Sequence, residues 1–156
     1  MRVSICAVGR LRTGPERDLI DDYVTRFDRT GRALGLGPLD LREVEDRKGG
    51  GMSAEAALLD KAVPAGAAVI ACDERGKVMT SPEFAQLLAR FRDDGRPDVS
   101  FLIGGADGLD PALRAKAEAS LSFGKMVWPH MLARVMLTEQ LYRAASILAG
   151  SPYHRV

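Results

Sequence analysis

Short apolar runs alternate along this chain with segments of helical periodicity. The runs at residues 3–8, 67–72 and 99–103 contain β-branched residues and stop at a glycine or a charged cluster, which is typical of buried strands. Residues 39–44 partly alternate between apolar and polar positions, which predicts a strand with one solvated face near a sheet edge. A further strand with its loop is expected within residues 121–128.

Helical patterns fill the spaces between these strands. The helix that opens at Ser81 is the clearest, because apolar residues recur at i, i+3, i+4 and i+7 from Phe84 until Gly95 stops the pattern. The other expected helices run from residue 15 to a loop at 31–38, from a Ser53 cap to 63, from an Asp110 cap to about 119, and from 131 to 148. The last helix is apolar on two sides, so a dimer interface is an economical way to bury its second flank.

Strands that alternate with helices predict an α/β fold with a mainly parallel sheet of about five strands and flanking helices. With 156 residues and no repeat or linker, residues 1–156 are expected to form one domain. In open parallel sheets, ligands bind at the carboxyl ends of the strands. The loop that begins at Gly104 and Gly105 is therefore the first place to expect a ligand, because glycine lets the backbone approach it closely.

Charge and composition limit the classes of partner. Basic residues (22) and acidic residues (21) nearly balance, so the whole chain exerts no strong attraction on nucleic acid. From Lys125 onward, however, four basic residues accompany a single acid, which predicts an electropositive C-terminal segment. Cys6 and Cys72 lie in apolar runs without metal-ligand spacing, so we expect reduced core thiols and no metal. Neither a signal peptide nor a membrane-spanning stretch is visible, so a cytoplasmic location without a membrane partner is expected.

Few segments carry the side chains or glycines that chemistry requires. The loop at Gly104 matches neither a P-loop nor a dinucleotide fingerprint, and no serine has a Gly-x-Ser-x-Gly setting. The flexible segment 46–51 carries two cations and is either a loop that closes on a ligand or RNA, or a solvated connector. At the C-terminus, Tyr153, His154 and Arg155 offer a stacking surface, a base and an anion clamp, with a frayed end as the alternative.

An ordered set of motifs closely resembles the RlmH family, the ribosomal RNA large subunit methyltransferases H. The motifs are Leu102-Ile103-Gly104-Gly105, Gly108-Leu109, Pro129-His130, Arg134-Val135, Glu139-Gln140-Leu141-Tyr142-Arg143-Ala144 and Pro152-Tyr153-His154-Arg155. The resemblance covers essentially the whole chain. It implies a SPOUT-type α/β fold with a mainly parallel sheet of about five or six strands, flanking helices and a C-terminal trefoil knot. It also implies a homodimer that transfers a methyl group from S-adenosylmethionine to N3 of a pseudouridine in 23S rRNA of assembled 70S ribosomes, without a metal.

The resemblance also implies roles for individual residues. It places cofactor contacts at Cys72, Gly104, Gly105, Phe123, Gly124, Lys125, Met126, Val127 and Trp128. Four of these depart from the more usual family residues, namely Cys72, Gly124, Val127 and Trp128. The implied catalytic set is His154 as base or positioner of the target ring, Arg155 and Arg143 as holders of phosphate or developing negative charge, and Tyr153 as a stacking surface.

Two other functions fit parts of the sequence. One is a non-catalytic ribosome-binding or assembly factor with the same fold, which would form no cofactor-dependent product. The other is an α/β enzyme for a small nucleotide or phosphate ligand, in which the loop at Gly104 serves as an anion-binding nest.

Overall fold

The computed structural model describes residues 1–155, which are organised around one five-stranded sheet. All neighbouring strands are parallel, in the order β2-β1-β4-β3-β5. The strands are β1 (Arg2–Val8), β2 (Leu39–Val44), β3 (Ala68–Val78), β4 (Asp98–Ile103) and β5 (Ala119–Ser122). β4 is central and buried throughout, and β2 lies at an edge as its alternation predicted. The predicted α/β fold with a parallel sheet is confirmed.

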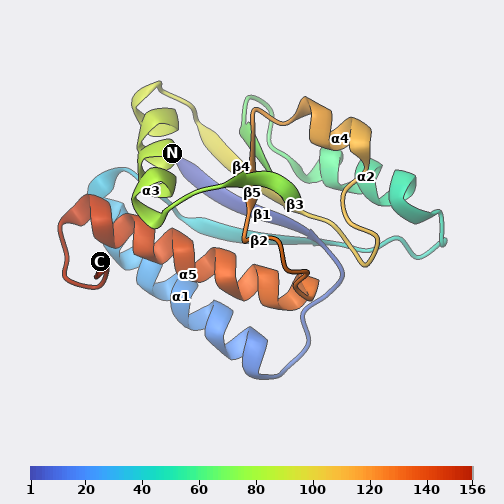
Figure 1. Ribbon diagram of the computed structural model, residues 1–156, viewed down its shortest axis with the longest axis horizontal. Helices are drawn as coiled ribbons and strands as arrows, with labels where there is room; N and C mark the ends of the chain where they lie inside the picture. Colours follow the sequence, from blue (N-terminus) through green and yellow to red (C-terminus); the bar gives the residue numbers. More distant parts are fainter. Residues whose placement is uncertain (156) are drawn as a thin grey trace.

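Helices cover both faces of the sheet (Figure 1). On one face, α1 (Pro15–Gly31), α3 (Ser81–Asp93) and α5 (His130–Ala149) enclose the larger core, which includes Phe27, Phe84, Phe101 and Leu141. On the other face, α2 (Gly51–Ala62) and α4 (Pro111–Lys116) bury a smaller cluster around Leu59, Leu102 and Leu113. A short 3₁₀ turn at Arg32–Leu34 follows α1. Among residues 1–155, none of these helices is both long and apolar enough to cross a membrane.

The start of α2 differs from the predicted cap at Ser53. The helix begins at Gly51, and its N-cap is Gly50, three residues before the predicted cap. The carboxylate of Asp46 accepts hydrogen bonds from the backbone N–H groups of Lys48 (3.1 Å) and Gly50 (2.5 Å). Those bonds shape a turn that leads directly into the helix, so no side-chain cap is needed at Ser53.

The N-cap of α3 lies one residue before Ser81, where the helix was expected to open. Thr80, rather than Ser81, is the N-cap, and its hydroxyl accepts a hydrogen bond from the N–H of Glu83 (3.2 Å). The Glu83 carboxylate in turn accepts a bond from the N–H of Thr80 (2.9 Å), which completes a capping box. In α4 the predicted cap is confirmed, because Asp110 accepts hydrogen bonds from Ala112 and Leu113.

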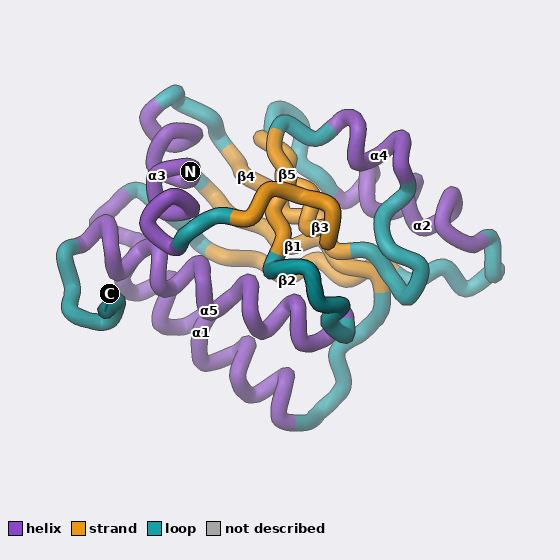
Figure 2. The backbone as a smooth tube through the Cα atoms, in the orientation of Figure 1, coloured by secondary structure: helices purple, strands orange, loops and turns teal. Residues whose placement is uncertain are grey.

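β3 is the element that differs most from prediction. It was expected to end at Cys72 but continues to Val78, and both Cys72 and Lys77 pair with Leu121 of β5. Residues 73–76, here called the β3 arm, therefore loop out and fold over β5, a sharp bend that Figure 2 shows. β5 itself starts at Ala119, two residues early, because α4 ends at Lys116. A trefoil knot in this region stays a prediction.

Candidate functional site

A cavity of about 380 Å³ opens where β3 and β4 end. Its walls come from the β3 arm, the loop between β4 and α4, the segment that follows β5, and the first turns of α2 and α5. Most of the predicted cofactor residues line it: Cys72, Gly104, Gly105, Phe123, Gly124, Met126, Val127 and Trp128. Lys125 lies on the same segment, is exposed, and is not among the lining residues. Three separate parts of the sequence thus meet here as predicted.

The loop after β4 has no room for a side chain at Gly104, because backbone lies too close, and little room at Gly105. A Cβ atom on Gly104 would clash with the backbone of Gly108, and one on Gly105 would lie 2.9 Å from the Glu55 carboxylate. The N–H of Gly108 closes the loop on the carbonyl of Gly105 (3.0 Å). The loop consequently presents backbone rather than side chains to the cavity, which suits close contact with a ligand.

Ser122 holds the opposite wall together. Its hydroxyl accepts a hydrogen bond from the N–H of Gly124 (3.1 Å) and lies 3.1 Å from the carbonyl of Glu74 on the β3 arm. Gly124 has a φ of 115°, in the region that favours glycine. Any side chain in place of Gly124 would therefore strain the backbone beside the cavity.

Sequence reasoning did not assign several residues of this site, among them Met52, Asp73 and Ser122. Met52 lines the cavity from α2, and the run of glycines before it was the available signal. Asp73 lines the cavity while its carboxylate lies 3.6 Å from the Arg114 guanidinium, and the sequence marked it only as part of the charged cluster that follows residues 67–72. Ser122 is buried, and no local pattern marked it.

The first turns of α5 carry two basic side chains of different character. Arg134 is fully buried, pairs with Glu43 (3.0 Å) and donates to the carbonyls of Val8 (2.6 Å) and Gly9 (2.8 Å). Arg134 therefore contributes no surface charge. The exposed positive charge of the C-terminal segment is consequently smaller than the sequence predicted. His130 lines the cavity, where burial and then the charge of Arg134 lower the pKa of its imidazole against an opposing effect of Glu55. Its neutral form is favoured.

The C-terminal residues form a second cluster, centred on Glu139. This carboxylate accepts hydrogen bonds from Arg143 (Nη2, 2.5 Å) and from the hydroxyl of Tyr153 (3.0 Å). Arg143 also contacts His154 Nδ1 (3.3 Å) and lies over the Tyr153 ring, 4.8 Å from its centroid. Burial, followed by the bond to Glu139, raises the pKa of Tyr153, so its phenol remains protonated.

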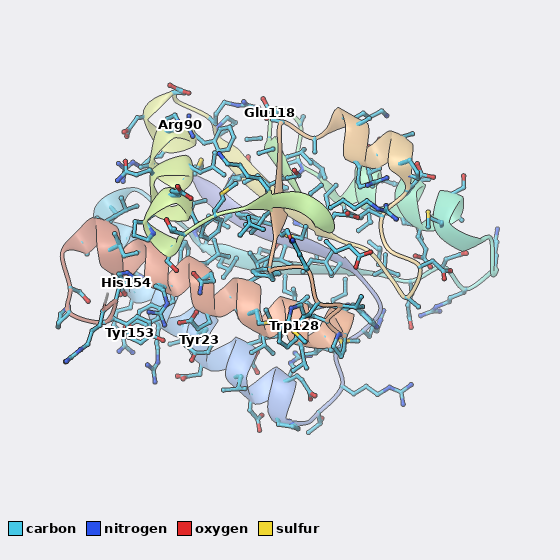
Figure 3. The ribbon with its side chains drawn as sticks, in the orientation of Figure 1. Tyr23, Arg90, Glu118, Trp128, Tyr153 and His154 are labelled. Atoms are coloured by element: carbon cyan, nitrogen blue, oxygen red, sulfur yellow. The ribbon has the colours of Figure 1, made fainter. Side chains whose placement is uncertain are left out.

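The two predicted sets of site residues do not meet within one chain. Figure 3 shows Trp128 beside the start of α5, whereas Tyr153 and His154 pack against its far end. Arg143 lies 13 residues after His130 on this helix, about 20 Å along its axis at 1.5 Å per residue. The cavity and the cluster at Glu139 are thus separate sites in a single chain.

The cavity has the properties of a cofactor pocket. Its volume lies within the range of roughly 300–1,000 Å³ that small-molecule sites occupy, and it sits at the carboxyl edge of a parallel sheet. Its lining combines backbone of the glycine loop, apolar side chains such as Phe123 and Val127, and the carboxylate of Asp73. Within residues 1–155 no cluster of side chains suited to a metal ion is found.

Comparisons with known proteins agree with this geometry. A family model described as "Predicted SPOUT methyltransferase" matches residues 1–154. The chain is 74% identical to Ribosomal RNA large subunit methyltransferase H of Dinoroseobacter shibae and 72% identical to that of Ruegeria pomeroyi, in each case over all of both chains.

Solved structures share the fold at low sequence identity. A probable methylase family protein from Haemophilus influenzae has a TM-score of 0.55 and 15% identity, over 99% of this chain and 70% of that one. A probable methyltransferase from Bordetella pertussis has a TM-score of 0.53 and 16% identity, over 92% and 94%.

The family model, with this fold and cavity, defines an α/β methyltransferase of the SPOUT class. The full-length identity assigns it more narrowly: the chain belongs to the family of ribosomal RNA large subunit methyltransferase H proteins, as its motifs had indicated.

Proposed function

We propose that this protein, acting as one SPOUT domain over residues 1–156, methylates N3 of a pseudouridine in 23S rRNA of assembled 70S ribosomes, with S-adenosylmethionine as methyl donor. The observation that carries the proposal is the glycine-lined cavity at the ends of β3 and β4. It occurs in a chain that matches relatives named for ribosomal RNA methylation along its full length. The reaction would take place in the cytoplasm, where ribosomes are.

The residues around the cavity suit S-adenosylmethionine, which when bound supplies an electrophilic methyl group. Backbone of the glycine loop would accept and donate hydrogen bonds, while Phe123 and Val127 would give apolar contact. Cys72 contributes contact rather than reactivity, because burial raises the pKa of its thiol to about 12. The proposed contact set is that expected from the sequence: Cys72, Gly104, Gly105, Phe123, Gly124, Lys125, Met126, Val127 and Trp128.

The cluster at Glu139 suits the other half of the reaction. N3 of a uracil ring carries a proton and becomes a good nucleophile only when that proton is removed. We assign His154 to accept this proton or to hold the ring, and Arg143 and Arg155 to stabilise negative charge on the base carbonyls or a phosphate. Tyr153 offers a stacking surface, and Glu139 fixes both Tyr153 and Arg143 by hydrogen bonds.

A homodimer would bring the two halves together. Because the cluster at Glu139 lies about 20 Å along α5 from the cavity, the tail of one chain would serve the cavity of its partner. Exposed apolar side chains beside the cavity support this arrangement: Met126 is 75% exposed, Val127 is 80% exposed, and Leu132 is also exposed. Apolar side chains gathered at one place on a surface are typical of protein interfaces.

Methyl transfer to ribosomes is the direct test. Labelled S-adenosylmethionine is incubated with 70S ribosomes that lack the modification, and the nucleosides are identified by mass. We expect 3-methylpseudouridine from the intact protein. Deletion of residues 153–156 should abolish the product while cofactor affinity stays within about twofold. Cofactor binding without product would favour a non-catalytic ribosome-binding factor, and no cofactor binding would favour a small-nucleotide enzyme.

Mixed dimers test which chain supplies the tail. One variant, Gly104→Val, has a blocked cavity, and the other lacks residues 153–156; each is expected to be inactive alone. When the two are refolded together, the truncated chain keeps an open cavity and can receive its partner's tail, so activity should return. If each tail serves its own chain, neither partner holds a complete set of residues and the mixture stays inactive.

A further inference from the structure

Two loops beside the cavity carry exposed positive charges that neither the cofactor nor the C-terminal tail accounts for. Arg10 and Arg12 lie on the loop after β1, and Arg47 and Lys48 lie on the loop after β2. β1 and β2 are neighbouring parallel strands, so both loops lie at the carboxyl edge of the sheet, where the cavity also opens. These four side chains are here called the basic rim.

The charge of the basic rim is only partly neutralised. Glu45 is shared by two guanidinium groups, those of Arg10 (3.3 Å) and Arg47 (3.8 Å). In the part of the chain that the structure describes, no carboxylate forms an ion pair with Arg12 or Lys48. Two of the four basic residues from Lys125 onward, Arg134 and Arg143, instead form ion pairs with Glu43 and Glu139. Positive charge is thus more available at the rim than on α5.

Both loops are joined to the wall of the cavity. The loop after β2 runs directly into α2, whose second residue, Met52, lines the cavity. The loop after β1 starts at Gly9, where an added Cβ would lie 3.5 Å from His130, another lining residue. A polyanion held on the basic rim would therefore lie next to the cavity.

The loop after β2 is also preorganised. The carboxylate of Asp46 accepts hydrogen bonds from two backbone N–H groups, which holds Arg47 and Lys48 on a defined turn. Less backbone conformational entropy is then lost when this loop engages a ligand.

We propose that the basic rim binds phosphates of the ribosomal RNA strand that flanks the target nucleotide, and so places the target base over the cavity. The inference rests on the proposed function, because it takes RNA as the substrate. A net charge of +1 gives the whole protein little attraction for RNA, so a local group of cations is required. Phosphate contacts of this kind set affinity and register without reading sequence.

The test uses a variant, here called the neutral-rim variant, in which neutral glutamine replaces each cation of the basic rim. Its substitutions are Arg10→Gln, Arg12→Gln, Arg47→Gln and Lys48→Gln. The KM for undermodified 70S ribosomes should rise at least about tenfold, a loss of roughly 1.4 kcal/mol, while kcat at saturation and cofactor affinity stay within about twofold. The dependence of log kcat/KM on log salt should become shallower by about 3, since each phosphate contact on single-stranded RNA contributes roughly 0.7.

A matched control removes the same charge from the opposite edge of the sheet. The substitutions Arg29→Gln, Arg32→Gln, Lys61→Gln and Lys116→Gln lie at the far ends of helices that return from the carboxyl edge. This variant should keep the KM of the unmodified protein. A further variant, in which lysine replaces the three rim arginines, keeps the positive charge. Its KM should stay low, which would show that charge rather than the shape of the guanidinium groups is required.

The outcomes separate this inference from the proposed function. Absence of methyl transfer by the unmodified protein would remove the proposed function itself. If the protein without substitutions transfers methyl groups and the neutral-rim variant has the same KM and the same salt dependence, the inference alone is overturned. A raised KM with an unchanged salt dependence would point to a ribosomal protein as the docking partner and would also overturn it. Should the fourfold variant fail to fold, Lys48→Gln alone must make the salt dependence shallower by about 0.7.

Discussion

At the scale of single residues, Arg134 joins the start of α5 to the ends of β1 and β2. Its guanidinium is completely buried and bonds to Glu43, Val8 and Gly9. Removal of one member of a buried ion pair leaves the other charge uncompensated, which costs about 3–5 kcal/mol. We expect Arg134→Met to lower the free energy of unfolding by about this amount, measured by urea denaturation.

A double-mutant cycle provides the control. Glu43→Leu combined with Arg134→Met removes both charges, so the double variant should be more stable than the sum of the two single losses predicts. An exposed arginine in α1, Arg29, should be replaceable by Met with a change of about 0.5 kcal/mol or less. Purely additive effects of the Arg134 and Glu43 substitutions would show that the pair is not coupled.

His130 gives a second prediction at this scale, for the dependence of stability on pH. Burial and the nearby Arg134 lower the pKa of His130 in the folded protein below its ordinary value of 6.5. As pH falls below that value, the unfolded chain binds a proton that the folded chain resists, so stability is lost. Between about pH 7.5 and pH 5.5, the unmodified protein should lose more stability than His130→Gln. An imidazole NMR titration should give His130 a midpoint below 6.5; an ordinary midpoint would refute the assignment.

At the scale of elements, the fold of the β3 arm over β5 depends on Gly76. A Cβ on this residue would lie 2.9 Å from the backbone N and C atoms of Leu121, and backbone cannot move aside as a side chain does. Gly76→Ala should therefore lift the arm and lower stability by about 1–3 kcal/mol. Because the arm forms one wall of the cavity, affinity for S-adenosylmethionine measured by calorimetry should also fall, by about tenfold or more.

Gly95 provides a glycine control away from the cavity. It has a φ of 78° and open space around it, so Gly95→Ala strains the backbone without a clash. We expect this variant to lose stability while its cofactor affinity is unchanged. If both glycine variants weakened cofactor binding equally, the effect would come from general destabilisation rather than from the β3 arm.

The helices and strands show how much of the fold could be predicted from the sequence. Periodicity identified all five strands and the five helices, because each buries an apolar face. It failed where hydrogen bonds rather than apolar faces decide the ends of an element: at the Asp46 turn before α2 and in the Thr80 capping box. The β3 arm was missed because residues 73–76 are mostly charged and look like a loop, whereas their placement depends on the distant Leu121.

At the scale of the whole molecule, local sequence patterns did not predict which charged side chains are buried in ion pairs. They also did not predict how far apart the cavity and the C-terminal cluster lie. Arg134 was counted as surface charge, since nothing near it in sequence reveals its partner Glu43. The family motifs named eight residues that line the cavity. The separation of the tail from the cavity follows instead from the length of α5, which places its two ends apart. The proposed catalysis therefore requires the assembly of two chains.

Assembly can be tested through two exposed leucines outside the cavity lining, Leu19 on α1 (45% exposed) and Leu132 on α5 (38% exposed). Since both are solvent-exposed in a single chain, Leu19→Glu with Leu132→Glu should leave its fold intact. The charges should prevent dimer formation, so sedimentation should show a monomer that still binds S-adenosylmethionine but transfers no methyl group to ribosomes. Val78→Glu, at an exposed apolar residue elsewhere, should remain dimeric and active. A fully active monomer would mean that one chain brings its own tail to its cavity.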